Sequence, residues 1–259
     1  MTVSSAVHSS SAIRPPRRHY AHAPVVETVV EIVAESKQGH NISQLKALGA
    51  KEPVYSEVRE THEFGAAVEL KAGGKASSEG HQRLIGYQFV DSAGARIFSA
   101  RVDRFSFSKL QPYTEWESVR DEALRLWHRY ANAAKVKKVT RLGVRYINRL
   151  DLPGPLIELK EWLLTGPEVA AGMPQQVAAF AMQLMLPQPD LQGTMAAVRI
   201  AVVDPPNPKT VSVVLDIDVQ RSGSDVGLSS LQNELDLLHD RENLIFECSI
   251  TDRVREKIG

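Results

Sequence analysis

Apolar and polar residues alternate along much of this chain, and alternation with a period of two is typical of β-strands that bury one face. In residues 25–33 the β-branched side chains are interrupted by Glu27 and Glu31, whose common face we expect to point to solvent. Glycine and serine clusters predict a hairpin loop at residues 71–81 and a tighter turn at residues 91–94. Further strands are predicted at residues 63–70, 84–90, 96–108, 139–152, 176–186, 194–203 and 210–220.

Other segments follow the helical period instead. Thr114 comes shortly after Pro112 and three residues before Glu117, which is the pattern of a capping box, so we expect a helix to begin there. A second helix is predicted at residues 228–239 and a short one at residues 157–164. The apolar stripes are Trp116, Val119, Ala123, Leu126, Trp127 and Tyr130 in the first helix and Leu228, Leu231, Leu235 and Leu238 in the second. Such stripes pack on a sheet, so the fold class expected is α+β, with antiparallel sheets and covering helices.

The order of the elements repeats along the chain. Val25 corresponds to Val139 at an offset of 114 residues, and the helix starts Thr114 and Gly227 are 113 residues apart. This spacing predicts two pseudo-repeated halves, residues 24–136 and 137–259, each with a strand, an excursion, a three-stranded meander and a helix. Each half would then cover a sheet of its own with one helix, or all strands would join in one large sheet or barrel.

Residues 1–23 differ from the rest of the chain in composition. They hold Arg14, Arg17 and Arg18 but no acidic residue, and Pro15 and Pro16 block a continuous helix. We interpret this segment as a disordered basic arm. A transit peptide, or an arm that contacts an acidic surface, is the functional alternative.

The charge and the cysteine content exclude or disfavour several kinds of partner and site. The chain has 31 basic and 31 acidic residues, and 28 against 31 remain once the three arginines of residues 1–23 are set aside, a net charge of −3. Nucleic acid is therefore a disfavoured partner, because a basic field is what gathers a polyanion. No apolar run is long enough to span a membrane. With one cysteine, Cys248, the chain can form neither an intramolecular disulfide nor a cysteine-based zinc site, which fits a reducing compartment and a cytoplasmic location.

Several segments resemble a known family. They are PVVETVVEI from Pro24, FSFSKL from Phe105 with Pro112, Tyr113 and Trp116 after it, and RLGVRYINR from Arg141, with further matches near Asp216 and Phe246. From Pro24 to the C-terminus the chain resembles a sporadically distributed bacterial family with no assigned reaction. The family's opening has two prolines where this chain has Ala23 and Pro24. The resemblance implies a bacterial protein of patchy occurrence, which suggests defence or toxin–antitoxin systems.

The segment after the first predicted helix carries the strongest candidate chemistry. Strand alternation places Arg141, Arg145 and Arg149 on one face, as a ladder in which neighbouring arginines lie about 13 Å apart, and such a ladder suits a phosphate chain or a nucleic-acid backbone. Asp216 and Asp218 share a face of a later strand, so they could instead neutralise the ladder by cross-strand pairing, which we prefer. Gly143, in the middle of the ladder, indicates a bulge or a close approach of another backbone.

Other chemistry has weaker support. Asp216 and Asp218 could hold Mg²⁺, but only if the ladder binds phosphate; otherwise we expect no cofactor. The histidines have no metal-ligand spacing, and the chain has neither a phosphate-binding glycine loop nor a nucleophile elbow. Tyr113 and Trp116 would mark a partner surface if their rings were exposed.

Two hypotheses for the function follow. The first is a non-enzymatic binding or regulatory component of a bacterial accessory system, in which a sheet or helix face engages a protein partner. The second is a protein or hydrolase that binds a phosphate ligand or nucleotide through Arg141, Arg145, Arg149, Asp216 and Asp218. The absence of recognisable catalytic motifs favours the first hypothesis.

Overall fold

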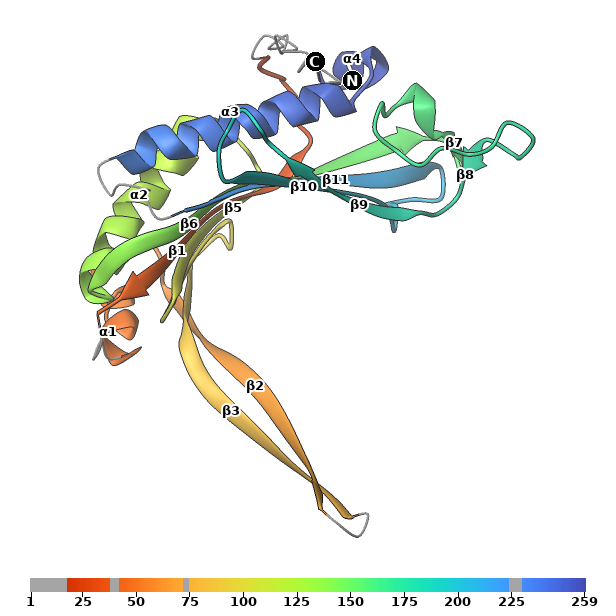
Figure 1. Ribbon diagram of the computed structural model, residues 1–259. Helices are drawn as coiled ribbons and strands as arrows, with labels where there is room; N and C mark the ends of the chain where they lie inside the picture. The colour runs from red at the N-terminus through yellow and green to blue at the C-terminus, as the bar shows by residue number, and fades with distance from the viewer. Residues whose placement is uncertain (1–17, 38–41, 72–74, 224–229) are drawn as a thin grey trace, which may run out of the picture.

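The computed structural model describes residues 18–37, 42–71, 75–223 and 230–259. Its centre is one nine-stranded antiparallel sheet in the order β2-β3-β4-β5-β1-β6-β11-β10-β9 (Figure 1). The strands are β1 (Val25–Ser36), β2 (Glu57–Lys71), β3 (Lys75–Val90), β4 (Arg96–Arg101), β5 (Arg104–Leu110), β6 (Val136–Pro153), β9 (Ala181–Pro187), β10 (Thr194–Val203) and β11 (Thr210–Ser222). A separate two-stranded sheet is formed by β7 (Ile157–Glu158) and β8 (Gln176–Val177).

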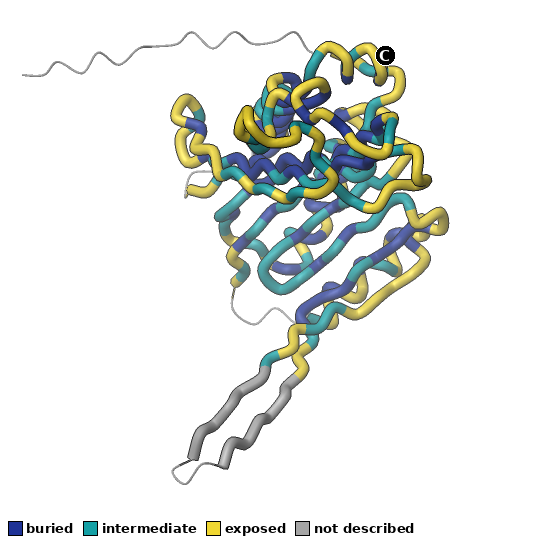
Figure 2. The backbone as a smooth tube through the Cα atoms, turned by 90° about the vertical axis from the view of Figure 1, so that its right-hand side faces the viewer, coloured by how far each residue is buried: buried dark blue, intermediate teal, exposed yellow. Residues whose placement is uncertain are grey.

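The long helices α2 (Trp116–Ala133) and α3 (Leu231–Ser249) lie on the same face of the sheet, and the other face carries no helix of the described chain (Figure 1). The short helices are α1 (Ile42–Lys46) and α4 (Asp252–Ile258), with 3-10 turns at Gly49–Lys51 and Leu159–Glu161. The core lies between the helices and the sheet. Its strand residues are among the buried positions that alternate along the strands in Figure 2. The predicted α+β class is confirmed.

The apolar stripes of both long helices are buried as their spacing predicts. In α2 all six predicted residues are buried, from Trp116 to Tyr130. In α3, Leu231, Leu235 and Leu238 are buried, whereas the predicted start at Leu228 lies outside the described residues. The capping box is wrong: α2 begins two residues after Thr114, with Glu115 as its N-cap and no side-chain capping bond.

Several predicted boundaries are also wrong. The strand predicted at residues 96–108 is a hairpin, because Val102 and Asp103 form a two-residue turn between β4 and β5. The loop predicted at residues 71–81 is shorter, since Lys71 already pairs with Lys75. The predicted strand 176–186 is divided into β8 and β9, and the predicted helix 157–164 is β7 followed by one 3-10 turn. The irregular stretch before β2 contains α1, whose Leu45 is fully buried.

The two predicted halves meet inside a single sheet. β1 pairs with β6 at the centre, and outward from this pair the order is β5-β4-β3-β2 on one side and β11-β10-β9 on the other. Of the two arrangements expected, the strands therefore adopt the single large sheet. The duplication itself stays a prediction, because this order concerns topology and not ancestry.

The end of the predicted basic arm is ordered. Residues 1–17 lie outside the described residues, but residues 18–23 run beside the C-terminus, where the His22 N–H donates to the carbonyl of Ile258 at 2.9 Å. The Tyr20 hydroxyl donates to the Glu247 carboxylate on α3 at 2.6 Å. These contacts hold residues 18–23 on the helical side of the molecule, and the disordered basic arm stays a prediction for the residues before them.

Candidate functional site

The helix-free face of the sheet carries the predicted arginine ladder. Arg141, Arg145 and Arg149 share this face of β6, whereas the alternate residues Leu142, Val144, Tyr146 and Asn148 face the core. On the neighbouring β11, Asp216 and Asp218 point to the same side, while Leu215, Ile217 and Val219 are fully buried on the other. The strand alternation that brings these five residues together is thus present.

Arg145 forms a two-pronged ion pair with Asp216. Its Nε and one terminal nitrogen each lie 2.7 Å from a carboxylate oxygen of Asp216. Arg199 of β10 approaches the same carboxylate from the other side, at 3.3 Å. Asp216 is only 6% exposed, and a buried carboxylate needs its charge compensated. Two guanidiniums, on the strands at either side of β11, provide this compensation.

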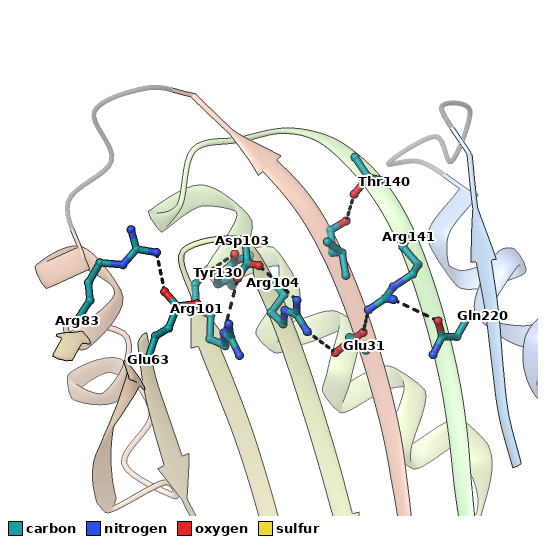
Figure 3. A network of polar contacts seen from close by, with 11 residues as sticks. Glu31, Glu63, Arg83, Arg101, Asp103, Arg104, Tyr130, Thr140, Arg141 and Gln220 are labelled. Atoms are coloured by element: carbon teal, nitrogen blue, oxygen red, sulfur yellow. Dashed lines mark hydrogen bonds and ion pairs between the residues drawn. The ribbon is translucent and has the colours of Figure 1, made fainter. Parts of the chain in front are cut away.

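The first arginine of the ladder is also paired. Arg141 binds the carboxylate of Glu31 on β1, and Arg104 of β5 approaches the same carboxylate at 3.6 Å (Figure 3). Arg141 also donates to the side-chain carbonyl of Gln220 at 3.2 Å. Glu31, expected as a solvent-facing acid, is half-buried and links β5 to β6 across β1.

Arg149, the third arginine, is held at its own end of the ladder. It donates to Asp151 at 3.0 Å and to the Ser212 hydroxyl at 3.0 Å. Asp218 has a different partner, the side-chain amide of Gln220 at 2.6 Å, and burial raises the pKa of its carboxyl above the usual value. Each ladder arginine therefore has an acidic partner within the sheet, which supports structural pairing over a phosphate site.

Tyr113 and Trp116 occupy the opposite, helical side. Trp116 is 5% exposed and stacks on the ring of His239 at 4.4 Å between ring centroids, so its ring does not meet the condition of exposure for a partner surface. Tyr113 is half-buried, and its hydroxyl lies 3.2 Å from the hydroxyl of Tyr146. Burial raises the pKa of Tyr113 to about 12 and that of Tyr146 well above its ordinary value, so both phenols are protonated at neutral pH.

The two edges of the sheet differ in charge. At one edge, the first seven residues of β2 include Glu57, Arg59, Glu60 and Glu63. At the other edge, β9 reads AMQLMLP, without a charged residue, and Met185 is 54% exposed. Edge strands of natural proteins usually carry charges that discourage pairing with another chain. β2 follows that rule and β9 does not.

The hydrogen bonds of β9 show which of its backbone groups are unpaired. The Val202 N–H donates to the Phe180 carbonyl, and the Gln188 N–H donates to the Thr194 carbonyl, both at 3.0 Å. In an antiparallel ladder the bonded residues alternate with residues whose N–H and C=O point away. Ala181, Gln183 and Met185 therefore direct these groups outward, and no strand of the described chain pairs with them. Pro187 takes the next outward position, where a missing N–H costs no bond to β10.

Sequence reasoning did not identify this edge. The signal in the sequence is the absence of charge between Ala181 and Pro187, but an uncharged strand is equally typical of a sheet interior. Only the strand order shows that β9 is outermost. A strand that looks like a central one therefore lies at a boundary of the sheet.

Within the described ranges, no group of three or more His, Cys, Asp or Glu side chains could hold a metal ion. None of the helices described is both long and apolar enough to cross a bilayer. A scan against models of known protein families finds no match, and a search of curated proteins finds no relative.

Proposed function

We propose that this chain is a binding protein that accepts an extended segment of a partner protein as a tenth strand beside β9. The observation that carries the proposal is the uncharged, exposed edge formed by Ala181, Gln183 and Met185. In strand addition, main-chain hydrogen bonds supply affinity, and side chains on alternate sides supply specificity. These three residues offer both the donors and the acceptors that such a segment needs.

The side chains around this edge favour a segment with apolar residues. Met185 is exposed on the helix-free face, and Leu186 is 38% exposed on the helical face. An added strand would lay its own alternating residues beside them. The segment expected is therefore an uncharged or weakly charged stretch of β-branched and aromatic residues, and not an acidic or basic tail.

The proposal places the chain among non-enzymatic components. Each arginine of the ladder already contacts an acid, so the polar face is suited to holding strands in register. The bacterial accessory system suggested by the family resemblance, of defence or toxin–antitoxin type and located in the cytoplasm, is the setting in which we place this partner. The phosphate or nucleotide hypothesis instead predicts that Arg145→Ala abolishes ligand binding and leaves the melting temperature nearly unchanged.

Met185→Pro tests the edge with little effect on the sheet. Proline at this position removes an outward N–H and leaves the bonds to β10 intact. The probe is a displayed library of random peptides about ten residues long, the upper end of usual strand lengths. Peptides selected on the wild-type protein should bind Met185→Pro about tenfold or more weakly, a loss of about 1.4 kcal/mol.

Met185→Thr is the matched control, because it shortens the side chain but keeps the N–H and suits a strand. Its peptide affinity should stay within about twofold of wild type, well under the 1.4 kcal/mol of a tenfold change. In the complex, the amides of Gln183 and Met185 should become protected from hydrogen exchange. Peptides that bind all three proteins equally would overturn the proposal. So would a wild-type dimer that Met185→Pro dissociates, since the edge would then serve self-association.

A further inference from the structure

A cavity of about 900 Å³ lies on the helical side of the sheet, and none of its lining residues belongs to β9. Its walls come from residues 18–25, residues 111–117, β6 and α3. This volume lies within the usual range for small-molecule sites in proteins. The aromatic rings of Tyr113, Trp116, Tyr146 and Phe246 are part of the lining.

One lining residue has an unusual environment. Glu242 of α3 is 2% exposed, and among the residues that the structure describes no hydrogen-bond donor or cation contacts its carboxylate. Burial raises the pKa of this carboxyl well above its usual value. A buried carboxylate normally has a partner, because removing an ion from water without compensation is costly. Glu242 therefore has capacity for a positively charged group that the described chain does not supply.

The surrounding groups favour a cation over an anion. Acidic residues outnumber arginines in the lining, with Glu115, Glu117, Asp240, Glu242 and Glu247 against Arg18 and Arg241. Arg241 is already bound to Asp190, and Glu247 is bound to Arg255, so neither of these two charges is directed to a ligand. The faces of tyrosine and tryptophan rings also attract cations, most strongly where water is excluded.

The same groups argue against a bare metal ion. Metal ions such as Mg²⁺ and Ca²⁺ need several oxygen ligands, and the described chain has no cluster of three potential ligands. Alkylated ammonium groups are instead recognised by aromatic rings together with a carboxylate, and they need few directed hydrogen bonds. The proximity of Tyr113, Trp116 and Tyr146 matches this second chemistry: Tyr113 and Tyr146 have ring centroids 5.7 Å apart, and Trp116 lies 6.5 Å from Tyr146.

We propose that the cavity binds a small organic cation of the alkylammonium class, with its charge beside the Glu242 carboxylate and its alkyl groups against the rings of Tyr113, Trp116 and Tyr146. The site is independent of the β9 edge, so either proposal can fail without the other. Glu242 supplies the charge and the rings supply the apolar contacts.

The test compares choline with 3,3-dimethylbutan-1-ol, which has the same shape but no charge. Binding to the full chain is measured by calorimetry at pH 8, with probe concentrations up to about 10 mM, since a 1 mM dissociation constant corresponds to about −4.1 kcal/mol. We expect choline to bind and the neutral alcohol to bind about tenfold more weakly or not at all. n-Butylamine serves as a second probe, which distinguishes primary from quaternary ammonium ligands.

Glu242→Gln removes the charge while keeping the size of the side chain. It should weaken choline binding about tenfold or more. Glu168→Gln, which alters an acid that is 87% exposed and is not a lining residue, should leave binding unchanged. A thermal melt of each variant confirms that it is folded. Equal binding of choline and the neutral alcohol, undiminished binding by Glu242→Gln, or no binding of either ammonium probe would overturn the proposal.

Discussion

Arg145 on β6 binds Asp216 on β11 through two hydrogen bonds of 2.7 Å, although the residue directly opposite Arg145 is Asp218. The guanidinium therefore reaches diagonally across the strand pair, a distance that long side chains can span. Asp218 instead accepts a hydrogen bond from the side-chain amide of Gln220. The Asp216 carboxylate joins β6, β11 and β10, because Arg199 of β10 also contacts it. The ion pair thus fixes the relative position of three strands.

Arg145→Ala is expected to destabilise the protein by about 1–3 kcal/mol, because Asp216 keeps Arg199 but loses its stronger partner in a buried position. The Arg145→Ala, Asp216→Ala double variant should recover part of this loss, since it leaves no unpaired buried acid. Chemical denaturation of the three variants measures the coupling. The opposite outcome is that Arg145→Ala melts like wild type but loses the increase in melting temperature that a nucleotide causes in the wild type. That result would support the phosphate hypothesis, in which the ladder is a ligand site.

Substitution by alanine should affect protein stability differently at two glycines of the sheet. A Cβ atom at Gly86 would lie 2.4 Å from the Ala100 carbonyl oxygen, whereas at Gly143 its nearest neighbour would be 3.6 Å away. We expect Gly86→Ala to destabilise by about 1–3 kcal/mol and Gly143→Ala to be neutral or slightly stabilising. Thermal melts of both variants check this. If Gly143→Ala lost as much stability as Gly86→Ala, the result would support the close backbone approach at Gly143 that the sequence predicts.

The stability of the chain should depend on pH through Glu242. The pKa of this carboxyl is raised above its ordinary value of 4.5, so the neutral form is favoured in the folded state. Its contribution is complete below the pKa of the unfolded chain and is lost as pH rises through the folded pKa. Glu242→Gln, neutral throughout, should melt above wild type at pH 8, by about 2–4 °C for each 1 kcal/mol gained. Near pH 4 the two melting temperatures should converge. A difference that does not change with pH would contradict this assignment.

Hydrogen exchange should alternate along β9 in the free protein. The amides of Leu184 and Leu186 donate to β10, and those of Gln183 and Met185 point outward. We expect the outward amides to exchange about as fast as those of an open loop and the inward ones far more slowly. Residue-resolved exchange measured by NMR checks the assignment. Uniform protection along β9 would mean that something already covers the edge.

Local pattern explains which parts of the fold were predictable. The buried stripe of α2 and the buried face of β11, with Leu215 and Ile217, follow from the helical and strand periods. The pairing of β1 with β6 did not follow, because it joins segments more than a hundred residues apart and leaves no local trace. The candidate edge on β9 depends on that same long-range order.

Glu242 was missed for a local reason. The second helix was predicted to end at His239, but α3 continues to Ser249, which places Glu242 on the same stripe as Leu235, Leu238 and Phe246. An acid on a buried stripe is a signal that sequence alone could supply. Glu242 was not recognised as a buried acid because the predicted helix ended before it. By contrast, the stacking of Trp116 on His239 joins two helices and needed the structure.

The unequal charges on the two sheet edges limit how the sheet can grow. Indefinite head-to-tail assembly would require β9 of one copy to pair with β2 of the next, in a heterologous contact that does not close. The acidic and basic side chains of β2 oppose that contact by placing charges against an apolar strand. Under the proposed function, a strand added beside β9 would therefore not be followed by the β2 edge of a second copy. The charges of β2 thus disfavour a head-to-tail fibre of this chain.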